Sequence, residues 1–109
     1  MFIYNITIKV DWDIHEQWLE WFKTYHVPAI LDYKCFYEAK LLKLHEIDES
    51  DGATYAVQFF AESKADYNRY IELYANEVST IERNFWNMKV MTFGTLMQVV
   101  EENFNEHSE

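Results

Sequence analysis

The sequence predicts a single α+β domain whose elements follow the order β-α-β-β-α-β. Two segments alternate apolar and polar residues with a period of two, as strands do, and two others repeat apolar residues at helical spacing. The 109 residues include only two glycines and one proline, which leaves little room for long irregular loops. Half of the residues are hydrophobic, which is too many for a disordered chain. We therefore expect one domain over residues 1–100, followed by an acidic tail over residues 101–109.

The first strand and helix are expected in residues 2–31. Residues 2–10 alternate, with one face made of Phe2, Tyr4, Ile6, Ile8 and Val10. Asp11 or Asp13 can then cap a helix over residues 13–25. Pro28 disfavours a simple continuation of that helix, because it restricts residue 27, and can instead begin a short second helix. The apolar face of the first helix is expected to hold Ile14, Trp18, Leu19, Trp21, Phe22 and Tyr25.

A hairpin is expected in the middle of the chain. Residues 36–45 form the second strand, but both of its faces carry apolar residues, so its phase stays open. Residues 46–52 form the tip, with Asp51-Gly52 as the turn signal. Residues 53–62 alternate again. One face of this third strand holds Tyr55, Val57 and Phe59, and the other holds Thr54, Ala56, Gln58 and Phe60.

A long second helix and a final strand complete the pattern. Ser63 can cap the helix, with Asp66 three residues later. Residues 88–100 form the last strand, in which Gly94 indicates a bulge or bend. The helix should bury one continuous stripe over about five turns: Tyr67, Tyr70, Ile71, Tyr74, Val78, Ile81 and Phe85.

Two strand–helix–strand units with right-handed crossovers give a four-stranded antiparallel sheet with both helices on one face. The first and third strands become central neighbours. Their other face stays open, small and polar in the middle and apolar toward its ends. Exposed apolar groups of this kind usually mark contacts, so we expect a homodimer that packs sheet on sheet. The open face of the central strands carries Ile3, Asn5, Thr7, Ala56, Gln58 and Phe60.

The chain resembles a known family at several motifs. These are Trp18 and Trp21 followed by His26-Val27-Pro28, the run 54–67, and the closing Phe93-Gly94-Thr95-Leu96. They are similar to a bacterial family known only as a domain of unknown function, within the dimeric α/β-barrel superfamily of ferredoxin-like proteins. The resemblance covers about residues 1–100. It implies a ferredoxin-like fold, a dimeric α/β barrel and, in some superfamily members, cofactor-free oxygenation or isomerisation.

Charge and composition exclude several partners. A net charge of −10 with only two arginines argues against nucleic acid and against an anionic membrane surface, because both need a basic patch. The segment 1–5 lacks the features of a signal peptide, and no stretch is apolar enough for a membrane span. The single cysteine, Cys35, excludes an intrachain disulfide and favours a reducing compartment. We therefore expect a cytoplasmic protein.

The candidate pocket consists of Asn5, Thr7, His26, Ala56, Gln58 and Phe60. His26 has two interpretations: a general base or ligand-orienting group at the barrel mouth, or a helix-end histidine that satisfies late carbonyls. The tyrosines at 67, 70 and 74 are interpreted as core, although they could also line a ligand site. No cluster has metal-ligand spacing, so we expect no metal and no cofactor.

The candidate pocket is compatible with two alternative functions. The first is a homodimeric binding or assembly module with a small-molecule pocket between the sheets, because the sequence contains no visible nucleophile–base pair. The alternative is a cofactor-independent enzyme of the oxygenase or isomerase type, acting on a small apolar substrate in the same pocket. Asn5 and Gln58 would orient a carbonyl or hydroxyl without a charge, and the catalytic residues of such an enzyme stay unknown.

Overall fold

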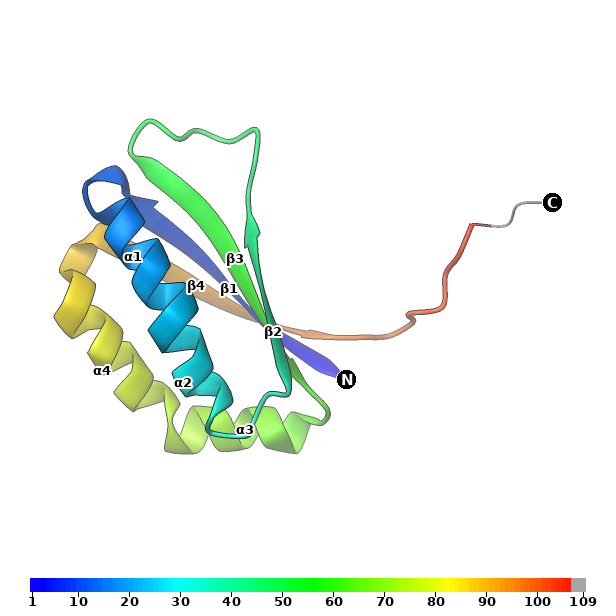
Figure 1. The fold of residues 1–109 in the computed structure, drawn as a ribbon. Coiled ribbons are helices and arrows are strands. Elements are labelled where there is room, and N and C mark those ends of the chain that lie inside the picture. The colour runs from blue at the N-terminus through cyan, green and yellow to red at the C-terminus, as the bar shows by residue number, and fades with distance from the viewer. Residues whose placement is uncertain (107–109) are drawn as a thin grey trace.

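The computed structural model describes residues 1–106 and confirms the predicted order of elements (Figure 1). The strands are β1 (Phe2–Asp11), β2 (Glu38–Lys43), β3 (Gly52–Ala61) and β4 (Val90–Gln98). The main helices are α1 (His15–Trp21), α2 (Val27–Leu31), α3 (Lys64–Leu73) and α4 (Ala75–Trp86). Short helical turns occur at Trp12–Ile14, Phe22–His26 and Asn87–Lys89.

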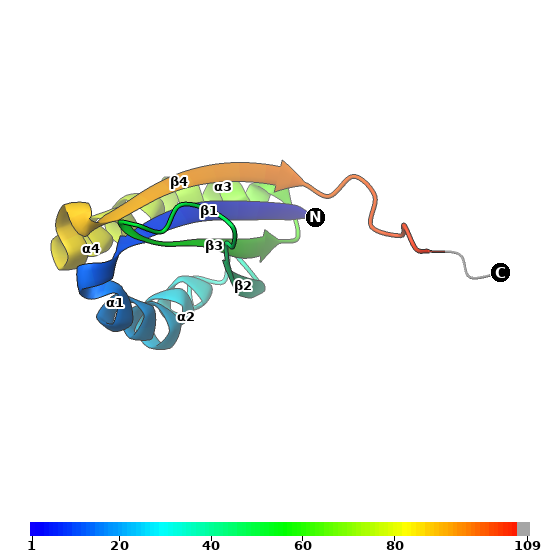
Figure 2. The ribbon, with the colours of Figure 1, turned by 90° about the horizontal axis from the view of Figure 1, so that it is seen from above.

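The four strands form one antiparallel sheet in the order β2-β3-β1-β4, so β1 and β3 are the central neighbours, as predicted. All four main helices lie on the same side of the sheet (Figure 1). In Figure 2 the strands β4 and β1 run across the view while β2 is foreshortened, so the sheet is strongly twisted. This twist curves the sheet around the helix layer.

The core lies between the sheet and the helices. The even-numbered residues of β1 and the odd-numbered residues of β3 face it, as their alternation predicted. The phase of β2 is now set, because Ala39 and Leu41 pair with the inward-facing Phe59 and Val57. The most deeply buried large side chains are Trp18, Phe59, Ile8, Val10 and Val57.

The first helix departs from its predicted form. It continues through Val27 and Pro28 without a break, because Phe22–His26 forms a π-helical turn. In that turn the Val27 N–H donates to the Phe22 carbonyl five residues back, which relaxes the crowding that Pro28 would cause in a regular helix. The wider turn also shifts the buried face by one residue. Tyr25, predicted to be in the core, is 63% exposed, whereas His26 is buried.

The second helix is two helices instead of one. The backbone at Tyr74 leaves the helical region, with φ −127° and ψ −26°, and this residue separates α3 from α4. The Tyr74 ring stacks on Tyr33, with ring centroids 4.0 Å apart. Because the helix axis changes direction there, the predicted stripe is interrupted. Tyr70 and Val78 are buried, but Ile71 and Phe85 are exposed.

The structure requires glycine at positions 52 and 94 for steric reasons that differ from the turn and the bulge predicted from the sequence. Gly52 is the first residue of β3 and not part of a turn, and a Cβ there would overlap the backbone carbonyl of Val10. The left-handed residue of this connection is Glu46, with φ 60°. Gly94 sits in a continuous antiparallel register opposite Ile6 and not in a bulge. A Cβ there would lie 2.9 Å from the Tyr4 hydroxyl, so the glycine makes room for the Tyr4 ring.

The segment that follows β4 extends away from the domain in Figures 1 and 2. Up to residue 106 it has no regular secondary structure, and its side chains are exposed from Val100 onward. The part of the predicted acidic tail that holds residues 107–109 lies outside the described residues. None of the helices in residues 1–106 has the length and apolarity needed to cross a membrane.

Replacing the two glycines tests this packing. We expect Gly52→Ala to lower the free energy of unfolding by about 3 kcal/mol or more, because the new methyl group meets fixed backbone. Gly94→Ala should cost about 1–2 kcal/mol, because the Tyr4 ring can shift slightly. Urea unfolding of both variants measures the difference. In a Tyr4→Leu background the cost of Gly94→Ala should fall close to zero; an unchanged cost would contradict the assigned contact.

Candidate functional site

The sheet face away from the helices carries five of the six residues predicted for the pocket. Asn5 pairs with Gln58, and Thr7 pairs with Ala56, across the two central strands. Phe60 lies beyond them, opposite Ile3. Since both partners in each of these pairs point away from the core, the face forms one continuous surface, here called the open face. The sixth predicted residue, His26, lies elsewhere.

A polar row crosses the middle of the open face. The row runs Thr95, Asn5, Gln58 and Lys40 from β4 to β2. Gln58 Nε2 donates to Asn5 Oδ1 at 3.4 Å, and Asn5 Nδ2 donates to Thr7 Oγ1 at 3.4 Å. Both hydrogen bonds are long, so they are weak and can be exchanged for bonds to another molecule. Asn5 and Gln58 are partly buried in the single chain.

Apolar side chains flank the polar row on both sides. Met97, Ile3 and Phe60 form one apolar row across the strands. On the other side Phe93 and Leu42 stand at the two edges of the sheet, with Thr7 and Ala56 between them. Phe93 is 71% exposed and Met91, next along β4, is 68% exposed. Large apolar groups that stay this exposed together usually mark a contact surface.

The contribution of β4 was missed by sequence reasoning. Met91, Phe93, Thr95 and Met97 alternate with Thr92, Gly94, Leu96 and Gln98, and that period of two was the available signal. Both sets mix polar and apolar residues, so the alternation does not say which set faces the core. The register against β1 decides the question, because Thr95 lies opposite Asn5.

The open face carries no excess of acidic residues. The charged residues that the four strands place on it are Lys9, Asp11, Glu38 and Lys40, all near its margins. The Lys40 ammonium lies 5.6 Å from the centre of the Phe60 ring, a cation–π contact. The charges on this surface therefore balance, within a chain of net charge −10. Two such chains can bring these faces together without opposing carboxylates in the middle.

His26 does not lie at the mouth of a barrel formed by the open face, where the sequence placed it. The π-helical turn directs it into the helix layer, where it is 3% exposed. Its Nε2 lies 2.8 Å from the Glu82 carboxylate, and its ring stacks on Trp21 with centroids 4.3 Å apart. The sheet separates His26 from Asn5 and Gln58, so these three groups cannot act on one atom.

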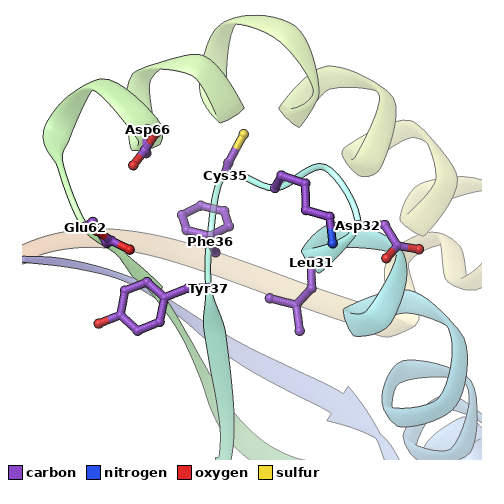
Figure 3. Close-up of a pocket in the computed structure, with 8 residues that line it drawn as sticks. Leu31, Asp32, Cys35, Phe36, Tyr37, Glu62 and Asp66 are labelled. Carbon is purple, nitrogen blue, oxygen red and sulfur yellow. The ribbon is translucent and has the colours of Figure 1, made fainter.

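A surface recess of about 380 Å³ lies beside the start of β2 (Figure 3). Its carboxylates do not converge. Asp32 lies across the Cys35–Tyr37 segment from Glu62 and Asp66 in Figure 3, and Asp66 is paired with Arg69 at 2.8 Å. The Cys35 side chain is buried and belongs to the core cluster. Within residues 1–106, no three His, Cys, Asp or Glu side chains are grouped so that they could hold a metal ion.

Comparisons with solved structures show the fold. A dimeric ferredoxin-like protein from an uncultured marine organism has a TM-score of 0.68 at 14% identity, over 96% of this chain and 100% of that one. A second dimeric ferredoxin-like protein of the same type of source has a TM-score of 0.64 at 9% identity, over 93% and 96%. HapK from Hahella chejuensis has a TM-score of 0.66 at 7% identity, over 98% and 100%. The α+β ferredoxin-like fold predicted from the sequence is thereby confirmed.

No curated protein matches the chain. One family model does, over residues 1–100, and its description is a domain of unknown function, DUF4286. The match spans nearly all of the chain and confirms the resemblance seen at the tryptophans of the first helix, in β3 and in β4. The chain belongs to the DUF4286 family.

Proposed function

We propose that this chain is a homodimeric binding or assembly module whose two copies pack open face to open face. One observation carries the proposal: the side chains of Phe93, Met91 and Leu42 are 71%, 68% and 43% exposed on a face that no helix covers. Burying such groups against a second copy removes apolar area from water at about 25 cal/mol per Å². A two-fold axis through the polar row would bring the polar row of one copy against the polar row of the other.

Two further observations support a second copy as the partner. The open face lacks the excess of carboxylates found over the rest of the chain, so self-association avoids most of the repulsion expected at a net charge of −10. Two structures with this fold are those of dimeric ferredoxin-like proteins. The single cysteine, Cys35, is free and buried, which is consistent with a protein that functions in the reducing cytoplasm.

The space between two such sheets would be the ligand pocket of this module. Asn5, Gln58 and Thr7 would form its polar floor, with Ala56 and Phe60 beside them. Each amide can donate and accept, so the pair fits a small, largely apolar molecule that offers one carbonyl or hydroxyl group. The weak 3.4 Å bonds between these side chains would be replaced by bonds to the ligand.

Binding is favoured over catalysis in this pocket by the chemistry of its polar groups. Asn5, Gln58, Thr7 and Thr95 are amides and hydroxyls, which do not change their protonation near neutral pH. A cofactor-independent oxygenase or isomerase needs a group that accepts a proton from its substrate. One of the two interpretations of His26 gave it that role, and His26 is held on the other side of the sheet.

Charge placed on the open face tests the dimer. We expect Phe93→Glu to give a folded monomer, because pairing would bring the two new carboxylates into an apolar interface. Leu73→Glu is the matched control, since Leu73 is 61% exposed but lies in the helix layer. Sedimentation equilibrium at micromolar concentration distinguishes a 13.2 kDa chain from a species of twice that mass. A wild-type protein that stays monomeric, or a dimer that survives Phe93→Glu, would refute the proposal.

The pocket is tested separately through its amides. Asn5→Leu and Gln58→Leu should each weaken binding of cyclohexanone, a small apolar carbonyl compound, by about 1–3 kcal/mol, because each change removes a hydrogen bond and strands its partner. NMR titration of the wild type and the variants measures the affinities. The same samples should sediment as dimers. Equal affinity in all three proteins would mean that these amides do not line the pocket.

A further inference from the structure

A small cavity lies on the opposite side of the sheet from the open face, between β1, β4 and the helix layer. It measures about 70 Å³, enough for a molecule of a few non-hydrogen atoms. Aromatic and aliphatic groups make most of its wall, including Phe22, Phe59 and Val78. Gly94 also lines it, and the missing side chain there leaves room beside the Tyr4 ring.

The polar atoms in this wall share one property. They belong to Tyr4, Tyr70, Ser79, Thr92 and Glu82, so each one can accept a hydrogen bond. Within residues 1–106, no lysine, arginine or histidine is among those that line the cavity. The cavity thus presents one carboxylate, four hydroxyls and several aromatic faces, which is the chemistry that proteins use to hold small organic cations.

Two phenols, those of Tyr4 and Tyr70, line the cavity. Tyr70 is 3% exposed. Burial, followed by the neighbouring Tyr4 and Glu82, raises the pKa of Tyr70 well above its usual value. The pKa of Tyr4 is also raised, by burial, Tyr67 and Glu82. Both phenols are therefore neutral, and their oxygens can accept from a ligand.

Glu82 is held in place from the far side by His26. The imidazole Nε2 lies 2.8 Å from Glu82 Oε2, and stacking on Trp21 fixes the ring. Only one carboxylate oxygen takes part in that bond, so Glu82 can still accept from a ligand in the cavity. His26 acts here as a positioning residue.

A surface cleft shares part of its wall with this cavity. The cleft measures about 170 Å³ and lies between α4 and β4, and Ser79, Glu82 and Thr92 line both spaces. Arg83 lines the outer cleft but not the inner cavity. Glu82 therefore lies in the wall that the two spaces share.

We propose that the inner cavity binds a small primary alkylammonium ion, of the size of methylammonium. Its three N–H groups would donate to Glu82, Tyr70 and a third oxygen from Tyr4 or Ser79. Its methyl group would rest against the aromatic and aliphatic wall. This site is independent of the proposed dimer and its pocket, because it lies within one chain on the other face of the sheet.

Titration with methylammonium chloride tests the proposal, followed by NMR of the amide and indole signals at constant ionic strength with sodium chloride. We expect saturable shifts in α4 and β4. Glu82→Gln should weaken binding by about tenfold or more, because it removes the charge and keeps the shape. Tyr70→Phe should weaken it about fivefold, because it removes one acceptor and keeps the ring. Glu77→Gln is the control: Glu77 is exposed on the same helix, so the variant loses one charge from the chain but none from the cavity.

Three results would overturn the proposal. One is sodium acetate shifting the same signals as strongly as methylammonium does. Another is Glu77→Gln weakening binding as much as Glu82→Gln, which would show a general effect of net charge. The third is affinity that remains unchanged in Tyr70→Phe, a variant that keeps the packing of the aromatic ring. Sedimentation of each variant shows the state of the dimer, so a failure here is distinguishable from a failure of the dimer proposal.

Discussion

Both helical units of this chain join strands of the same sheet through right-handed crossovers, so all of their helices must lie on one face of that sheet. The rest of the structure follows from this constraint. One face of β1 and β3 becomes core, where Ile8 and Val57 are each 1% exposed. The other face is not covered by any element in residues 1–106 and keeps large apolar groups such as Phe93 in water. Four strands and one helix layer thus leave an α+β domain of this size half-covered, which makes a second copy the natural partner in our proposal.

The helix layer adapts to the sheet at two places, and both shape the inner cavity. The π-helical turn at Phe22–His26 carries the first helix past Pro28 and brings His26 inward against Glu82. The break at Tyr74 lets α3 and α4 follow different parts of the twisted sheet. A straight helix would bury Phe85 in line with Tyr70, whereas the broken one exposes Phe85 and leaves Tyr70, Val78 and Glu82 beside the cavity. Gly94 completes the arrangement from the sheet side by leaving space around Tyr4.

The separation of the two faces also divides the chemistry of the molecule. The open face offers amides and hydroxyls between apolar rows, which suits a neutral ligand or a second copy. The inner cavity offers a carboxylate and phenols within an aromatic wall, which suits a small cation. A reader of the sequence would group His26 with Asn5 and Gln58, because all three are polar residues in or beside apolar segments. The sheet lies between them, so they belong to different sites.

The sequence by itself determined the element order, the sheet topology, the inward faces of β1 and β3, and the place on the open face of five of the six residues predicted for the pocket. Each of these depends on short-range periodicity or on crossover handedness, which neighbouring residues encode directly. The tertiary structure alone decided which residues of β2 and β4 face the core, where His26 lies and where the helix breaks at Tyr74. It also decided why positions 52 and 94 require glycine. These depend on contacts between distant residues, such as Gly94 with Tyr4 or His26 with Glu82, which are 56 positions apart in the second case. A local pattern carries no information about which distant side chain will occupy the space next to it.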